Sequence, residues 1–295
     1  MSKHTLSFLV FAKRKPGLAS CLRFLRSRSA HVQVFIGERG DPFPVLPAAE
    51  QPPDVIISYL APWVVPMGVL QKARVAAINF HPGPPEYPGI GCTNFALYNQ
   101  ERMYGVTAHH MTERVDTGPI IAVRRFPIHQ EDSVLALTQR CYQHLSVLLK
   151  EVVTAYLSMG RLPEPQERWA RKPSTRQDLE RLCEVQMGMS PEEVARRVRA
   201  TTYPGMPGAF IDLYGYRFAY VDRPTRRNTG MSHRLKGNYD LPKDQAKPTT
   251  QPPETVSQEF ERRALERLGG SIAFVLKGKT FVWNGDSKPT GPQHE

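Results

Sequence analysis

Cysteine is scarce in this chain, and long apolar runs are missing from it. The four cysteines of the 295 residues stand far apart, with no C-x-x-C pair and no spacing typical of a zinc site. We therefore expect reduced thiols and no structural metal. The apolar run in MSKHTLSFLVFAKRK is about seven residues long, too short for a secretory signal or a membrane span. These absences predict a cytoplasmic protein without a membrane partner.

Negative charge is also in short supply. Lys and Arg number 39 against 28 Asp and Glu, which gives a formal net charge of +11. Such an excess favours anionic partners, whether nucleic acids, phosphorylated small molecules or membrane surfaces, and does not choose among them. Residues 223–258 are rich in Pro, Thr, Lys and Arg but poor in large apolar residues, so they predict a flexible basic linker.

The first half of the chain alternates short apolar segments with helical patterns. Strands are expected at residues 5–12, 31–37, 54–60, 74–82, 105–111 and 118–128, and helices at 18–28 and 133–160. This order predicts an α/β fold, Rossmann-like, with a mostly parallel sheet covered on both faces. No G-x-G-x-x-G follows the first expected strand, so the sheet is not expected to bind a dinucleotide.

Composition changes after residue 160. Residues 161–177 are polar and carry prolines, and we interpret them as a crossing to a second, β-rich unit. A helix is expected at 190–201, followed by β-hairpins at 209–222 and 271–286. The predicted organisation is a large α/β domain at 1–165, a small β-rich subdomain at 166–222, the linker at 223–258, and a short helix with a hairpin at 259–295.

Two polar residues stand at the end of the fourth expected strand. Asn79 and His81 are two positions apart, so their side chains project from the same face. Pro82 then ends strand pairing, because it has no N–H to donate. The carboxyl ends of parallel strands open onto the ligand crevice, where an amide and an imidazole can bind a developing oxyanion. Asp116, in a loop before an apolar strand, supplies a carboxylate that can move a proton.

Several ordered motifs surround these residues. They are NFHP at 79–82, YPG at 87–89, YGVTAHHM at 104–111 and VDTGPII at 115–121. Together they resemble the formyltransferases that use 10-formyltetrahydrofolate, which include glycinamide ribonucleotide, methionyl-tRNA and sugar-nucleotide amine formyltransferases. The resemblance covers residues 54–128 closely and 1–160 in its pattern. One departure is local: GPPE at 83–86 stands where the family often has Ser-Leu-Leu-Pro.

The resemblance implies a reaction and roles for the site residues. An acceptor amine would attack the formyl carbon of the co-substrate 10-formyltetrahydrofolate, with Asn79 and His81 holding the oxyanion. Asp116 would support the histidine and help to move the proton of the amine, and no metal is needed. His109 either assists these residues or is an ordinary strand residue. The pterin of the folate is expected to bind near Trp63, Val64, Val65, Met111 and Val115.

The acceptor is less sharply indicated. Residues 196–222 resemble the start of the small β-domain that follows the catalytic domain in methionyl-tRNA and aminosugar formyltransferases. The leading hypothesis is a primary amine on a small acceptor, phosphorylated or linked to a nucleotide, such as an aminosugar. The basic charge favours the alternative of a methionyl-tRNA formyltransferase-like enzyme. An enzyme of a secondary-metabolite pathway and a non-catalytic module with a folate-binding fold also stay open, as does a homodimer.

Overall fold

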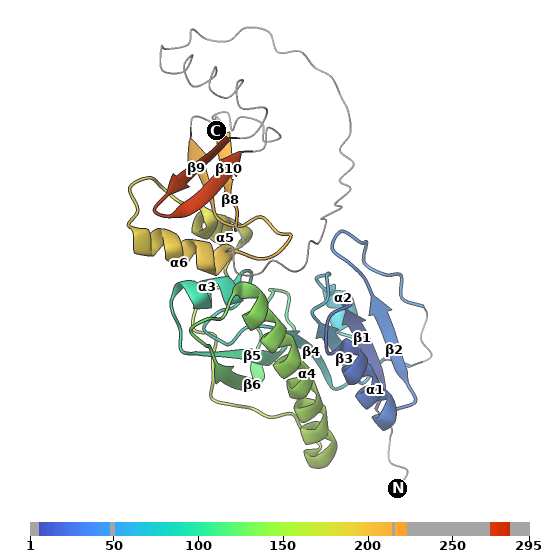
Figure 1. Cartoon of the computed structure of the whole chain (residues 1–295). Helices are drawn as coiled ribbons and strands as arrows, with labels where there is room; N and C mark the ends of the chain where they lie inside the picture. The colour runs from blue at the N-terminus through green and yellow to red at the C-terminus, as the bar shows by residue number, and fades with distance from the viewer. Residues whose placement is uncertain (1–5, 48–50, 214–215, 223–271, 284–295) are drawn as a thin grey trace, which may run out of the picture. The chain divides into compact units, whose positions relative to one another are not determined.

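The structure, a computed structural model, describes residues 6–47, 51–213, 216–222 and 272–283. The predicted linker at 223–258 and the helix predicted to follow it lie outside these residues. The described chain forms two compact units (Figure 1). One comprises Met1–Cys183 with Arg196–Pro207, and the other Glu184–Ala195 with Gly208–Glu295. Residue 165, where sequence analysis ends the first domain, falls inside the first unit.

The first unit is built on a six-stranded sheet of order β2-β1-β3-β4-β5-β6. Its strands are β1 (Phe8–Ala12), β2 (Val32–Ile36), β3 (Val55–Tyr59), β4 (Ala76–His81), β5 (Met103–His110) and β6 (Ile120–Pro127). The four strands from β2 to β4 run parallel, whereas β5 and β6 are antiparallel to their neighbours. The predicted mostly parallel sheet is confirmed.

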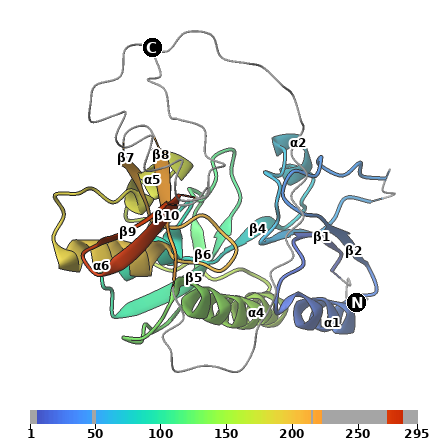
Figure 2. The same cartoon turned by 45° about the horizontal axis from the view of Figure 1, so that its top comes forward.

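Two apolar cores bury the sheet on both faces. In β1, Phe8, Val10 and Ala12 belong to the larger core, whereas Leu9 and Phe11 belong to the smaller one. Alternate residues of a strand point to opposite faces, so a strand buried on both faces is apolar throughout, as FLVFA is. The larger core includes the inner sides of α1 (Leu18–Arg28) and α4 (Val134–Met159). These two helices lie side by side on one face of the sheet (Figure 2).

Local sequence signals set the ends of the long helix. The Ser133 side chain caps α4 by accepting a hydrogen bond from the Ala136 N–H at 3.2 Å, and Gly160 ends the helix in the left-handed conformation. The helix expected at 133–160 is therefore confirmed. The remaining helices of the first unit are α2 (Met67–Leu70), α3 (Cys92–Tyr98) and α5 (Arg176–Cys183).

The second unit contains an antiparallel sheet of order β7-β8-β10-β9. Its strands are β7 (Phe210–Leu213), β8 (Tyr216–Tyr220), β9 (Ile272–Leu276) and β10 (Lys279–Trp283). Both predicted hairpins are present, although the turn expected at Gly215 lies outside the described residues. The division between the units crosses α6 (Pro191–Thr201), the helix expected at 190–201.

Candidate active site

The structure brings together the three polar residues that sequence analysis singled out. Asn79 and His81 leave β4 on one face at its carboxyl end, and Asp116 approaches them from the loop between β5 and β6. Asp116 has a φ of 51°, a left-handed conformation that Asn and Asp adopt more readily than other non-glycine residues. That backbone turn is one reason why an aspartate suits this position.

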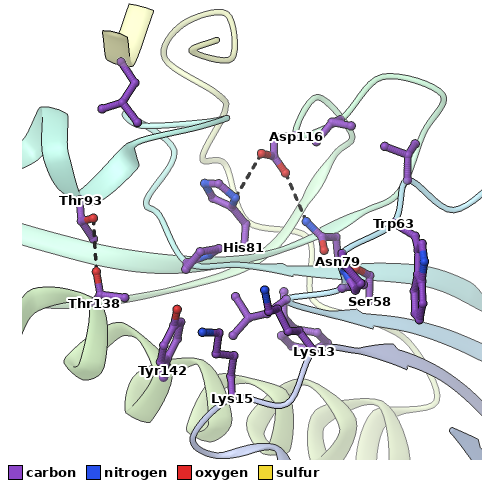
Figure 3. Close-up of a pocket in the computed structure, with 18 of the residues that line it drawn as sticks. Lys13, Lys15, Ser58, Trp63, Asn79, His81, Thr93, Asp116, Thr138 and Tyr142 are labelled. Atoms are coloured by element: carbon purple, nitrogen blue, oxygen red, sulfur yellow. Dashed lines mark hydrogen bonds and ion pairs between the residues drawn. The ribbon is translucent and has the colours of Figure 1, made fainter. Parts of the chain in front are cut away.

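The Asp116 carboxylate is the hub of a buried hydrogen-bond network (Figure 3). Its Oδ2 lies 3.2 Å from His81 Nδ1 and accepts the Gly89 N–H at 3.0 Å. Its Oδ1 lies 3.2 Å from His109 Nε2 and accepts the Asn79 Nδ2 amide at 3.2 Å. Four groups from three segments of the chain thus converge on one carboxylate. His109 is a member of the network, and its role in catalysis stays a prediction.

The surroundings of Asp116 control its charge. Burial is the largest influence and by itself raises the pKa, but nearby His81 and His109 and the hydrogen bond from the Gly89 N–H together lower the pKa of Asp116 to about 2. The carboxylate is therefore ionised throughout the neutral pH range. In that pH range the Asp116 carboxylate carries no proton, so it can accept one directly.

His81 is held through both of its ring nitrogens. Nε2 lies 3.1 Å from the Tyr87 carbonyl oxygen, which can only accept, so Nε2 carries a proton. When the ring is protonated, Nδ1 donates to Asp116. Burial lowers the pKa of His81, with Asp116 opposing the effect, so this second proton is readily given up. Gly83 leaves room for the arrangement, because a Cβ there would lie 2.6 Å from Nε2 and 2.7 Å from the Tyr87 oxygen.

His109 fixes the orientation of the Asn79 amide. Its Nδ1 lies 2.8 Å from the carbonyl oxygen of His110 and donates to it, so Nε2 is left to accept the Asn79 Nδ2 amide at 3.0 Å. Both N–H groups of Asn79 are then directed at His109 and Asp116. If Asn79 is to bind an oxyanion, one of them must turn from these partners to the substrate.

Residues 166–175 pack over this site. Sequence analysis interpreted them as part of a crossing between the first unit and a second, β-rich unit. The indole of Trp169 stands edge-on to the rings of His81 and His109, at centroid distances of 5.9 and 5.1 Å. Its Nε1 donates to the Gly118 carbonyl oxygen at 2.8 Å. We call this stretch the roof segment. The one sequence signal for this contact was a single tryptophan in a polar stretch. That signal does not indicate which residues the indole contacts.

Backbone hydrogen bonds fasten the roof segment to the loop after β4. The Ala170 N–H donates to the Pro85 oxygen at 3.0 Å, and the Ser174 N–H donates to the Pro88 oxygen at 3.0 Å. Gly89 permits this contact, since it has a φ of 87° and a Cβ there would lie 2.4 Å from the Ser174 oxygen. The prolines and glycines therefore give this loop a conformation in which its carbonyl groups can accept hydrogen bonds from a distant part of the chain.

A cavity of about 740 Å³ opens beside Asn79, His81 and Asp116. The residues expected to contact the pterin all line it, namely Trp63, Val64, Val65, Met111 and Val115. The Trp63 ring also packs edge-on against Phe11 and Phe43, and its Nε1 donates to the Asp41 oxygen at 2.9 Å. Trp63 therefore belongs both to the cavity wall and to the apolar packing behind it.

Among the described residues, no group of three or more His, Cys, Asp or Glu side chains is placed to hold a metal ion. In the same residues, no helix is long and apolar enough to cross a membrane.

Comparison with known proteins identifies the part of the chain that carries the site. Residues 47–153 match the family model described as Formyl transferase. The chain carries a formyl transferase domain. All three residues of the predicted triad, together with His109, lie within this domain, whereas the roof segment lies outside the matched range.

Solved structures share the fold of the formyl transferase domain and its surroundings. A sugar N-formyltransferase from Shewanella is 18% identical, with a TM-score of 0.58 over 73% of this chain and 96% of that one. An N-formyltransferase from Helicobacter canadensis, in complex with folinic acid and dTDP-3-aminofucose, is 17% identical, with a TM-score of 0.54 over 72% and 95%. HypX from Aquifex aeolicus, in complex with tetrahydrofolic acid, is 22% identical, with a TM-score of 0.53 over 77% of this chain and 40% of that one.

Proposed function

We propose that this chain is a folate-dependent N-formyltransferase that moves the formyl group of 10-formyltetrahydrofolate to a primary amine. The observation that carries the proposal is the ionised Asp116 carboxylate, which contacts His81, His109 and Asn79 beside a large cavity in a formyl transferase domain. A structural ion pair alone would not need an open cavity next to it.

The site residues suit this reaction step by step. The amine attacks the formyl carbon, and its carbonyl oxygen becomes an oxyanion, which an N–H of Asn79 or His81 turns to bind. Asp116 accepts the proton of the amine and passes it to Nδ1 of the neutral His81 ring, which delivers it towards the folate nitrogen, so both side chains end in their starting protonation states. The bond between the formyl carbon and that nitrogen then breaks, releasing tetrahydrofolate and the formylated amine.

The acceptor that fits best is a nucleotide-linked aminosugar. Solved structures with this fold include sugar N-formyltransferases, one of them in complex with dTDP-3-aminofucose. The cavity beside the triad is large enough for an extended small molecule. The net charge of +11 favours the second candidate, a methionyl-tRNA acceptor, because phosphate contacts dominate affinity for nucleic acids.

A formyl-transfer assay tests the proposal. The protein would receive 10-formyltetrahydrofolate with dTDP- and UDP-aminosugars, glycinamide ribonucleotide, methionyl-tRNA or water alone, while released tetrahydrofolate is followed. We expect turnover with an aminosugar nucleotide and a fall in kcat of roughly 10²–10⁴-fold in Asp116→Asn. The matched control is Glu113→Gln, which removes one negative charge from an exposed position of the same loop.

Each remaining outcome points to a different conclusion. Folate release with water alone would replace the transferase by a hydrolase. Turnover of methionyl-tRNA, with retention that falls steeply as salt rises, would establish the second candidate. No turnover with any amine, together with no binding of the folate, would overturn the proposal.

A further inference from the structure

The connection between β1 and α1 sends alternate basic side chains to opposite sides. Lys13 and Lys15 are half-buried and line the cavity, whereas Arg14 between them is exposed and is not part of the lining. Figure 3 shows both lysines on the wall of the cavity that also carries Tyr142 of α4.

In the part of the chain that the structure describes, few carboxylates lie close enough to neutralise the positive charge of this wall. Among the described residues, no carboxylate is recorded within ion-pair distance of Lys15, whose ammonium lies 6.0 Å from the centre of the Tyr142 ring. Lys13 pairs at 2.9 Å with Glu38, but that carboxylate is largely exposed and outside the cavity lining. Asp116 is the one carboxylate among the described lining residues, and histidines already surround it.

Hydroxyl groups complete the wall. Burial raises the pKa of Tyr142 to about 12, so its phenol keeps the proton and can donate it in a hydrogen bond. Thr93 and Thr138 line the same part of the cavity, with their Oγ1 atoms 3.5 Å apart. A half-buried wall of two ammonium groups and several hydroxyls is a set of donors that an anion with several oxygens can satisfy. We call Lys13, Lys15 and Tyr142 the basic wall.

We propose that the basic wall binds a phosphate or diphosphate group of the acceptor while the acceptor amine reaches Asp116. This inference rests on the proposed function and names the feature that selects the substrate. The acceptor is a molecule that carries both a primary amine and a phosphate ester, not an amine that lacks a phosphate group. Two ammonium groups match the two negative charges of a phosphate monoester, or of the diphosphate bridge of a sugar nucleotide, better than the single charge of a carboxylate. A partly desolvated site strengthens the contact relative to an exposed pair.

The folate is the other ligand with negative charges, since its glutamate tail carries carboxylates. The apolar part of the cavity, where Val64 and Val115 lie, has a different cation at hand, the exposed Arg114. A folate whose ring occupies that part can direct its tail to Arg114 and to solvent. The basic wall is thereby left to the acceptor.

Binding measurements test the basic wall without turnover. Calorimetric titrations would use dTDP, inorganic pyrophosphate and folinic acid with the native protein, Lys15→Ala, Lys15→Arg and the charge-matched control Arg14→Ala. We expect Lys15→Ala to weaken dTDP and pyrophosphate binding about tenfold or more, because it removes a charge-assisted hydrogen bond. Lys15→Arg should recover part of that loss. Arg14→Ala should change neither ligand more than about twofold, and no variant should change folinic acid binding.

Different failures have different meanings. If Lys15→Ala weakens folinic acid and spares dTDP and pyrophosphate, the wall holds the folate tail and the inference is overturned. If Arg14→Ala and Lys15→Ala weaken dTDP equally, or if dTDP and pyrophosphate do not bind, the inference is also overturned. If phosphates bind at the wall but folinic acid binds to no form of the protein, the anion site stands and the proposed formyl transfer fails.

Discussion

The indole of Trp169 meets the imidazole of His109 edge to face, with ring centroids 5.1 Å apart and an angle of 83° between the planes. The same indole lies 5.9 Å from the His81 ring. One side chain from the roof segment therefore covers both histidines that contact Asp116. Since burial is what lowers the pKa of His81, Trp169 has a direct influence on the protonation of the site.

Trp169→Ala should shift the acid limb of the pH profile of kcat/KM to higher pH. Removing the indole admits water beside His81, which weakens the burial that lowers its pKa. Trp169→Phe keeps an apolar ring and loses only the hydrogen bond to Gly118, so its profile should stay close to that of the native enzyme. A uniform loss of activity at every pH in Trp169→Ala would show that the indole acts only on folding.

Asp116 should make the stability of the protein fall in acid. Its pKa in the folded protein, about 2, lies below the unfolded value near 3.8. A lowered carboxyl pKa stabilises the fold above the unfolded pKa, and this contribution is lost as pH falls through the folded pKa. The shift corresponds to about 2 kcal/mol of unfolding free energy.

Asp116→Asn is the variant that isolates this effect, because Asn tolerates the left-handed backbone conformation at this position. Urea unfolding of native protein and variant would be compared at about pH 6 and about pH 2, at constant ionic strength. The difference in unfolding free energy between the two proteins should shrink in acid. A difference that is the same at both pH values would contradict the assigned ion pairing.

Gly83→Ala should impair catalysis more than folding. The added Cβ would come within 2.7 Å of both His81 Nε2 and the Tyr87 oxygen, so it must separate the two. With this bond lost, His81 is free to change its orientation, and we expect kcat to fall about tenfold. The control is Gly68→Ala, since Gly68 lies in α2 and nothing stands within 4 Å of its added Cβ. Equal kinetics for the two variants would show that the Tyr87 contact does not position the imidazole.

His109→Gln should lower kcat and leave KM for both substrates nearly unchanged. The histidine holds the Asn79 amide at 3.0 Å and contacts Asp116, but the Asn79 and Asp116 side chains remain in the variant. We expect a loss of about tenfold, below that of Asp116→Asn. His31→Gln, at an exposed position, controls for the loss of an imidazole elsewhere. An unchanged kcat would make His109 an ordinary strand residue.

Local patterns in the sequence were enough to predict much of the fold and the centre of the site. The alternation within β4 places Asn79 and His81 together, and the motif order places Asp116 near them. The apolar runs predict the strands, and the helical spacing of apolar residues predicts the long helix. The signals in β4, in the other strands and in the long helix each act within a few residues, so they can be read without knowing the rest of the structure. Asp116 stands 35 residues after His81 in the sequence, and only the order of the motifs linked the two.

The other parts of the site depend on contacts that no local pattern encodes. The Tyr87 carbonyl is a backbone group, and its meeting with His81 depends on the path of the loop through Gly83. Lys15 reaches the cavity from the short connection between β1 and α1, a stretch that looks like an ordinary strand end in the sequence. Trp169 reaches the histidines only because the chain returns over the loop after β4.

The roof segment returns over the loop after β4 from a later part of the sequence. Its position in the sequence sets the order in which a growing chain can complete its catalytic centre. Once the ribosome has released the chain through α4, all six strands of the first sheet are available to pair, yet the partners of Pro85 and Pro88 are still unmade. Domains generally fold as units during synthesis. The catalytic centre is therefore complete only after the chain has been synthesised as far as Ser174 and has bound the loop after β4. A nascent chain forms the six-stranded sheet before it forms a working active site.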